Sequence, residues 1–180
     1  SFTLSNTVAG GVYNANRSLS SALPVGASFS VRFRLAHLDN SGFTNGFQLQ
    51  DASGNVLFSF YHKGGDNNNG WFTDANGTGI ATNFTYNFQG FSSLTFTLNS
   101  PTTYTFKDNG PGNGSFSGTL ANAAITQVTF FRANTNAIPT AGQDFESNAL
   151  AITALGSKPV FAVQPKNTAA IAGGTVTLSA

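Results

Sequence analysis

The chain has 180 residues, of which 40% are hydrophobic and only 8% are charged, and its formal net charge is +1. This balance excludes the dense basic surface that binding to nucleic acid requires, and no apolar run of about 18 residues is present to span a membrane. With 18 phenylalanines and no cysteine, the chain can fill a core but has no disulfides, which fits a secreted or surface-exposed bacterial protein.

Short segments in which apolar and polar residues alternate follow one another along the chain. They are bounded by Gly, Asn, Asp, Ser or Pro, which is typical of antiparallel strands joined by turns. Helical periodicity is almost absent. The predicted strands are 28–38, 46–51, 55–63, 93–100, 103–108, 115–120, 126–133 and 149–153.

Two connections, DASGN (51–55) and KDNGPGNGS (107–115), predict hairpins because Asn and Gly tolerate positive φ between antiparallel strands. Roughly ten or more short strands exceed the number in an immunoglobulin sandwich. The pattern therefore predicts an all-β fold, an antiparallel β-sandwich of the jelly-roll type with two stacked sheets.

The composition changes near residue 156, where two prolines and a Gly-Gly pair follow. We expect a β-sandwich domain over 1–155, and a linker with the first strands of a second domain over 156–180. The segment KPVFAVQPKNTAAIAGGTVTLSA resembles the opening of a bacterial immunoglobulin-like repeat. This resemblance implies a longer multidomain protein, and we expect the chain to be monomeric within it.

Alternation also predicts which side chains face away from the core, since successive residues of a strand point to opposite sides. If the strands share one sheet, its outer face combines amide and guanidinium groups with an aromatic plane. That mixture suits sugars, whose hydroxyls need donors and acceptors and whose C–H faces rest on rings. The alternative is an ordinary polar sheet face. The predicted outward residues are Arg32, Arg34, Gln48, Gln50, Tyr61 and Lys63.

The single tryptophan, Trp71, follows the polar loop GGDNNNG. One interpretation makes it a stacking platform beside Tyr61 and Lys63; the other makes it a plug at the end of the core. Arg132 and Asn134 end another strand, where they either add donors for a sugar or cap a loop. An arginine pair on the same surface favours a uronic or sulfated ligand.

Carboxylates are scarce, since Asp and Glu total seven. Neither His37 nor His62 lies in a recognisable triad motif, and no phosphate-binding loop is present, so we expect a protein that is not an enzyme and has no cofactor. A structural Ca²⁺ is the one metal considered, because oxygen donors are abundant. Its weak candidate ligands are Asp66, Asp74, Asp144 and Glu146.

The segments FSVRFRL, GFQLQDASGNVLFSF, LTFTLNSPTTYTFKDNG, FSGTLANAAITQVTFFRANTN and DFESNALAIT, taken in this order, resemble a concanavalin-like or laminin G-like jelly roll over residues 1–155. Members of that superfamily include lectins, carbohydrate-binding modules, polysaccharide-degrading enzymes and adhesion domains. The E-x-D-x-x-E arrangement of the related glycoside hydrolases is missing here. The resemblance therefore implies sugar binding rather than hydrolysis.

These observations favour a noncatalytic carbohydrate-binding module of a secreted bacterial polysaccharide-degrading enzyme, with a polysaccharide or oligosaccharide as its partner. A structural or adhesive spacer of a bacterial surface protein is the first alternative. The second is a polysaccharide lyase, in which His37, Tyr61, Arg32 and Arg34 would supply a base and neutralise a uronate.

Overall fold

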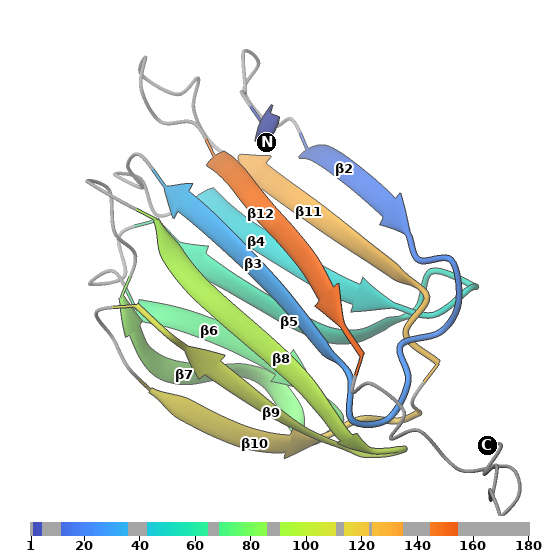
Figure 1. Cartoon of the computed structure of the whole chain (residues 1–180). Helices are drawn as coiled ribbons and strands as arrows, with labels where there is room; N and C mark the ends of the chain where they lie inside the picture. The colour runs from blue at the N-terminus through green and yellow to red at the C-terminus, as the bar shows by residue number, and fades with distance from the viewer. Residues whose placement is uncertain are drawn as a thin grey trace, which may run out of the picture.

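A computed structural model describes residues 2–4, 12–35, 43–64, 69–85, 91–110, 114–122, 124–134 and 145–154. These residues form two antiparallel sheets of six strands each, stacked face to face (Figure 1). The described residues include no helix that is long and apolar enough to cross a membrane. The all-β sandwich predicted from the sequence is confirmed.

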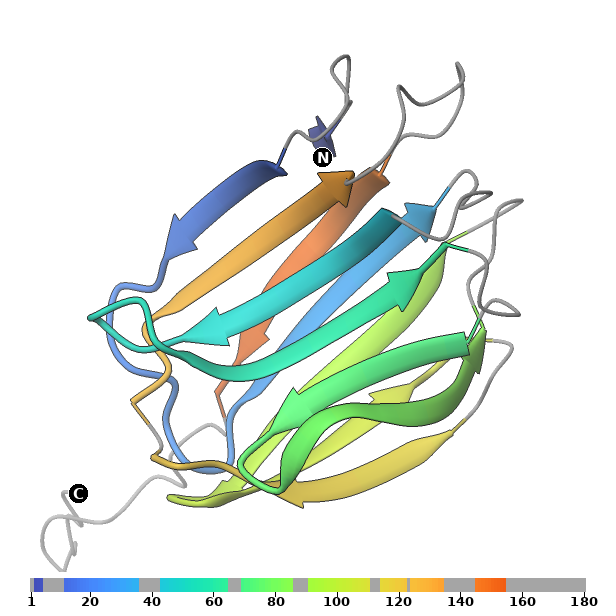
Figure 2. The ribbon, with the colours of Figure 1, turned by 180° about the vertical axis from the view of Figure 1, so that it is seen from behind.

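Sheet A has the strand order β1-β12-β3-β8-β9-β10, and sheet B has the order β2-β11-β4-β5-β6-β7. Sheet B faces the viewer in Figure 2, with β4 to β7 in cyan to green. The strands are β1 (Phe2–Leu4), β2 (Val12–Ser18), β3 (Ser28–Leu35), β4 (Phe43–Gln50), β5 (Val56–Lys63), β6 (Asn69–Asp74), β7 (Gly77–Thr85), β8 (Ser92–Ser100), β9 (Thr103–Asp108), β10 (Ser115–Thr119), β11 (Gln127–Asn134) and β12 (Phe145–Thr153).

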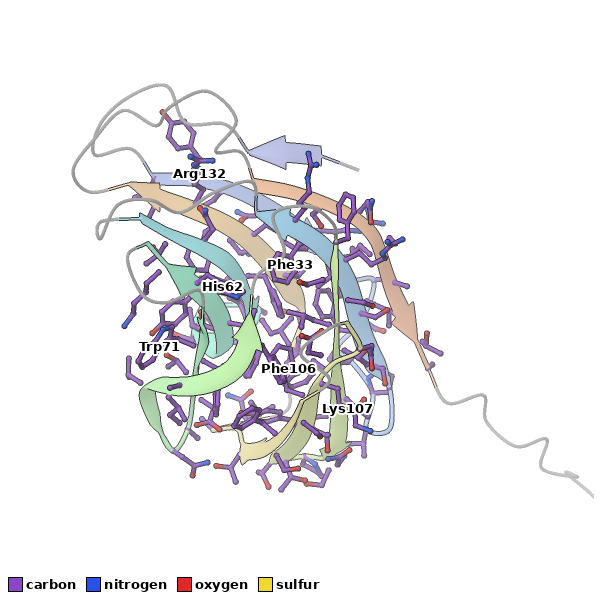
Figure 3. All side chains as sticks on the ribbon, turned by 90° about the vertical axis from the view of Figure 1, so that its left-hand side faces the viewer. Phe33, His62, Trp71, Phe106, Lys107 and Arg132 are labelled. Atoms are coloured by element: carbon purple, nitrogen blue, oxygen red, sulfur yellow. The ribbon has the colours of Figure 1, made fainter. Side chains whose placement is uncertain are left out.

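Aromatic rings fill the space between the sheets. Phe58 and Phe60 on β5 each lie 5.0 Å from Phe106 on β9, measured between ring centroids, and Phe96 stacks on Tyr104 at 4.9 Å. All five side chains are fully buried. Pairs of this geometry stabilise a core beyond the area they bury. The inward positions of the alternating segments thus form one continuous core (Figure 3).

The β4–β5 hairpin forms at the predicted turn. Asp51 Oδ1 accepts hydrogen bonds from the N–H groups of Ser53 and Asn55 at 2.9 Å, and Oδ2 accepts one from the Asn55 side-chain amide at 2.8 Å. These bonds, led by the one from the Asn55 side chain, lower the pKa of Asp51. Gly54 adopts a φ of 83° at the same turn. The predicted hairpin at 107–115 is also present, as Lys107 pairs with Ser115.

Asp74, at the end of β6, ties the two sheets together. The Tyr104 hydroxyl on β9 donates to Asp74 Oδ2 at 2.8 Å, and the Thr119 N–H on β10 donates to the same oxygen at 3.3 Å. The Asn76 N–H donates to Asp74 Oδ1 at 2.8 Å. Burial, reinforced by the Asp74 carboxylate, raises the pKa of Tyr104 far above its ordinary value. We call this set of hydrogen bonds to Asp74 the Asp74 clasp. A Cβ at Gly118 would overlap Asp74 Oδ2 and the Tyr104 hydroxyl oxygen, so the clasp requires a glycine at this position.

Four strands were not predicted: β1, β2, β6 and β7. The segment TDANGTG (73–79), which is rich in oxygen donors, is the β6–β7 turn with its flanking strand residues. The proposed second domain over 156–180 lies outside the described residues, as does its resemblance to an immunoglobulin-like repeat.

Candidate functional site

A row of side chains crosses the outer face of sheet B at right angles to its strands. The register pairs Phe131 on β11 with Gly46 on β4, Gly46 with Tyr61 on β5, and Tyr61 with Trp71 on β6. Trp71 is paired in turn with Ala81 on β7. We call Phe131, Tyr61 and Trp71 the aromatic row. Since neighbouring strands lie about 4.8 Å apart, the row extends over about 14 Å.

Gly46 opens a gap in the aromatic row between Phe131 and Tyr61. A Cβ at this position would overlap the carbonyl oxygen of Phe60 and lie 2.7 Å from the Cα of Tyr61, so the strands approach too closely for any side chain. Around the gap the surface forms a shallow hollow of about 380 Å³. Its lining residues are Thr44, Gln48, Val56, Ser59, Tyr61, Thr73, Thr78 and Phe131.

A second row, made of polar side chains, runs beside the aromatic row. Thr129, Gln48, Ser59 and Thr73 are consecutive partners across β11, β4, β5 and β6. Hydroxyls and amides supply both donors and acceptors at neutral pH, without a charge. Aromatic planes beside such groups form a surface suited to sugar rings.

Gln48 is oriented by a relay of hydrogen bonds on the same face. Gln127 Nε2 and Thr129 Oγ1 both donate to Gln50 Oε1 at 2.8 Å, and Gln50 Nε2 donates to Gln48 Oε1 at 3.0 Å. Gln50 is only 9% exposed, so its amide serves the relay rather than a ligand. Within the described residues no hydrogen bond occupies Gln48 Nε2, which leaves that donor for the hollow.

Trp71 lies on the outer face rather than in the core, because its neighbour Phe72 points inward and is buried. The Lys63 ammonium is 4.2 Å from the centre of the Trp71 ring and 5.7 Å from that of Tyr61. The indole Nε1 is buried and has no hydrogen-bond partner among the described residues. Trp71 therefore lies beside Tyr61 and Lys63 and does not plug the core, while its role as a stacking platform stays a prediction.

The prediction that Arg32 and Arg34 share this surface is wrong. Both belong to β3, which pairs with β8 and β12 in sheet A. Outward residues of sheet A point away from those of sheet B across the whole thickness of the sandwich. Figure 3 shows this separation for Trp71 and Lys107, which lie on opposite sides of Phe106. The arginines therefore cannot contact a ligand bound on the aromatic row.

Arg132, which was expected either to add a donor for a sugar or to cap a loop, points into the sandwich with 0% exposure. It occupies the same side of β11 as the buried Phe130, and it pairs with Asn45, which pairs with His62. Figure 3 shows the two labelled members of this inner row, Arg132 and His62, on the same side of Phe106. Arg132 therefore cannot contact a ligand that is bound on the outer face of sheet B.

His62 is fully buried and contacts the rings of Phe60 and Phe33, with centroids 5.1 and 5.8 Å away. Its Nε2 lies 3.2 Å from the Phe84 carbonyl oxygen. Desolvation lowers the pKa of His62 to about 4, because burial disfavours the charged imidazolium. The histidine is therefore a neutral core residue.

The weak metal candidates are only partly described. Both oxygens of Asp74 accept the hydrogen bonds of the clasp, while Asp66 and Asp144 lie outside the described residues. The side chains of Glu146 and Asn134 also fall outside the description. Among the residues that are described, no group of three or more His, Asp or Glu side chains could hold a metal ion.

The sequence interpretation missed Phe131, which completes the aromatic row. The signal was present in TQVTFFRA, since Val128 and Phe130 point inward and the alternation then turns Phe131 outward. Gly46 was missed for a different reason: its closeness to Phe60 depends on a strand pairing that no local pattern shows.

No protein-family model and no curated protein sequence matches the chain. Among similar solved structures, congerin II liganded with lactose and MES has 11% identity and a TM-score of 0.53, covering 78% of this chain and 100% of congerin II. Apo Crh5 transglycosylase has 10% identity and a TM-score of 0.58, covering 81% of this chain and 68% of the enzyme. A sialidase has 8% identity and a TM-score of 0.58, covering 81% of this chain and 14% of the sialidase. The chain therefore shares the fold of these proteins, a β-sandwich of two stacked antiparallel sheets.

Proposed function

We propose that this protein is a noncatalytic carbohydrate-binding module whose ligand lies across the outer face of sheet B. The main support for this proposal is the strand register, which brings Phe131, Tyr61 and Trp71 into one row. Gly46 leaves a gap in that row between Phe131 and Tyr61. A row of about 14 Å is longer than one sugar ring, so the ligand is an oligosaccharide or an internal stretch of a polysaccharide.

The ligand proposed for this face is neutral. Lys63 is the one cationic side chain among the described residues of the outer face, and the hollow itself is lined by hydroxyl, amide, aromatic and aliphatic groups. Stacking on the rings and hydrogen bonds to Gln48, Ser59 and Thr73 together match the two surfaces of a pyranose. The uronic or sulfated ligand expected from Arg32 and Arg34 is not proposed for this face, because those residues lie on sheet A.

The same proposal includes the wider setting inferred from the sequence: a module attached to a polysaccharide-degrading enzyme, exported to the outside of a bacterium. A module of this kind raises the effective concentration of its enzyme on the substrate without adding chemistry. The likeness in fold to a lactose-liganded congerin and to a transglycosylase supports a sandwich that binds glycans. The identity of the ligand has to be argued from the residues of this face, because a fold does not determine a function.

The test is retention of the full chain on immobilised neutral, uronic and sulfated polysaccharides, followed by titration with the oligosaccharides of any polymer that retains it. Tyr61→Ala and Phe131→Ala should each weaken binding to a neutral glycan about tenfold, because each removes one stacking surface. Thr105→Ala, a control on the outer face of sheet A, should leave binding unchanged. Equal affinity of Tyr61→Ala and the unaltered protein would exclude the aromatic row as the site.

A structural spacer is the competing function, favoured by the polar row of Thr129, Gln48, Ser59 and Thr73 on the outer face of sheet B, which is compatible with contact to water alone. It predicts that the folded chain is retained by none of the three polymer classes. Circular dichroism of the same sample establishes that the protein is folded, so a negative result on all three classes would decide for the spacer.

A further inference from the structure

The outer face of sheet A carries an arrangement that the aromatic row does not use. The Cζ of Arg32 lies 5.3 Å from the centre of the Phe91 ring, and the Cζ of Arg34 lies 6.0 Å from it. One aromatic ring thus contacts two guanidinium groups, both directed away from the core. A cation over a ring face is attracted by the quadrupole of the ring, which orders a side chain that would otherwise sample many rotamers.

Arg32 is the more accessible of the two arginines. It is exposed, and it makes no ion pair or hydrogen bond through its side chain within the described residues. A guanidinium stacked on a ring keeps its planar edge free, and that edge carries the paired N–H donors that match an oxyanion. Arg34 differs, since it is half-buried and its backbone is paired with that of Glu146.

Polar groups flank Arg32 on both neighbouring strands. The register pairs Arg32 with Ser93 on β8 and with Asn148 on β12, which places the three residues side by side across the strands; the Oδ1 of Asn148 is buried and has no hydrogen-bond partner among the described residues. A hydroxyl and an amide can each donate a hydrogen bond. Ser93, Arg32 and Asn148 therefore form a line of donors with a fixed positive charge at its centre.

The charged side chains that the structure describes on the outer face of sheet A are all positive. Lys107, on β9, is exposed on the same side as Arg32 and Arg34. Asp108 points inward and is buried, and the other two described carboxylates, Asp51 and Asp74, belong to sheet B and its turns. The side chains that the structure describes on the outer face of sheet A therefore carry only positive charge, whereas the hollow on sheet B is neutral; Glu146, which pairs with Arg34 on this face, is not among the described side chains.

The geometry points to a second binding site, centred on Arg32 with Ser93 and Asn148, for an oxyanion of the sulfate or carboxylate type. On a polysaccharide this group is a sulfate ester or a uronic acid. The site is separate from the aromatic row, because stacked sheets lie about 10 Å apart and the two outer faces point in opposite directions. One glycan chain cannot cover both faces, so a protein with both sites can hold two chains, or two segments of a matrix, at once.

The experiment compares three oxyanion probes with the full chain: sodium sulfate, polygalacturonate and dextran sulfate. Binding is followed by the NMR signal of the Arg32 side chain and by titration at several salt concentrations. We expect all three probes to shift the Arg32 signal, and Arg32→Gln to weaken binding to the polymers about tenfold. Arg32→Lys keeps the charge without the planar fork and should recover only part of the affinity.

Two variants distinguish a defined binding site at Arg32 from a general electrostatic attraction of the anion to the whole face. Lys107→Gln removes the same charge from the same face, on a strand separated from β3 by β8, and should change affinity less than twofold. Phe91→Leu keeps all charges and removes the ring that orders Arg32, so it should weaken binding severalfold with little change in the dependence on salt.

Three outcomes would overturn the inference: no shift of the Arg32 signal with any probe, equal losses in Arg32→Gln and Lys107→Gln, or unchanged binding in Arg32→Gln. A shift with sodium sulfate that is absent with polygalacturonate would assign the site to sulfate and away from uronates. Retention on neutral polymers reports on the aromatic row alone, so failure of either site is recognised independently of the other.

Discussion

The Lys63 ammonium lies 4.2 Å from the centre of the Trp71 ring, in the position that a sugar ring would need for stacking. A cation–π contact at an exposed site contributes about 0.5–1 kcal/mol, and a neutral ligand has to displace it. We therefore expect Lys63→Met to bind neutral oligosaccharides about two- to fivefold more tightly than the unaltered protein. Because Trp71 is the only tryptophan, intrinsic fluorescence measures binding at this position directly.

The control for that change is Lys107→Met, which removes an equal charge from the opposite outer face and should not alter the affinity. A Lys63→Met protein that binds neutral glycans more weakly would show that the ammonium contacts the ligand instead of competing with it.

Gly46 is expected to tolerate no side chain. In Gly46→Ala the new methyl group would overlap the Phe60 carbonyl oxygen, so strands β4 and β5 must separate locally. We expect a loss of about 2–3 kcal/mol in the free energy of unfolding, together with weaker glycan binding. Gly77→Ala is the matched control, since nothing lies within 4 Å of its Cβ position. Chemical denaturation of both variants gives the comparison, and equal stabilities would contradict the close approach.

The Asp74 clasp should contribute measurably to the attachment of sheet B to sheet A. Tyr104→Phe removes a buried hydroxyl that donates to Asp74 Oδ2 at 2.8 Å, and hydrogen bonds to charged groups contribute about 1.5–3 kcal/mol. We expect a loss of that size in thermal or chemical unfolding. Tyr61→Phe removes a hydroxyl that makes no hydrogen bond within the described residues, and should cost less than about 0.5 kcal/mol.

Protonation of His62 should make the protein less stable in mild acid. Its pKa is about 4 in the folded protein, against 6.5 for a histidine exposed to water, so between these values the unfolded chain binds a proton that the folded chain does not. The stabilisation is fully present above pH 6.5 and is lost as the pH falls toward 4, by up to about 3 kcal/mol. Asp51, whose pKa is lowered, loses its contribution as the pH falls through still more acidic values.

The measurement is the free energy of unfolding as a function of pH, for the unaltered protein and for His62→Gln. The glutamine can keep a hydrogen bond to the Phe84 carbonyl without titrating. The slope between pH 4 and 6.5 should become markedly smaller in the variant. If both proteins show the same slope, the acid sensitivity originates elsewhere in the chain.

Local patterns were sufficient to predict most strands and the direction of most side chains. In FSVRFRL the inward Phe33 and the outward Arg32 follow from alternation, and the same rule turns Gln48 and Tyr61 outward. This works because consecutive side chains of a strand point to opposite faces, whatever the strand is paired with.

Strands β6 and β7 were not predicted from the sequence. Their segments, NGWFTD and GTGIATNFT, are rich in Gly, Asn and Thr and therefore resemble loops. They are strands because β5 offers an unpaired edge and because Phe72 and Phe84 enter the common core. Strand formation of this kind depends on tertiary packing rather than on intrinsic propensity.

By itself, the sequence determined that this protein is a β-sandwich and which side chains leave its core, since both follow from a period of two along each strand. Only the tertiary structure decided which strands share a sheet, because β3 pairs with β8 and β12 while β4 pairs with β5 and β11, and these pairings join residues far apart in the chain. The alternation of apolar and polar residues along a strand is the same whichever sheet the strand joins. For that reason Arg32 and Tyr61 were both correctly predicted to point outward, yet they face opposite sides of the molecule.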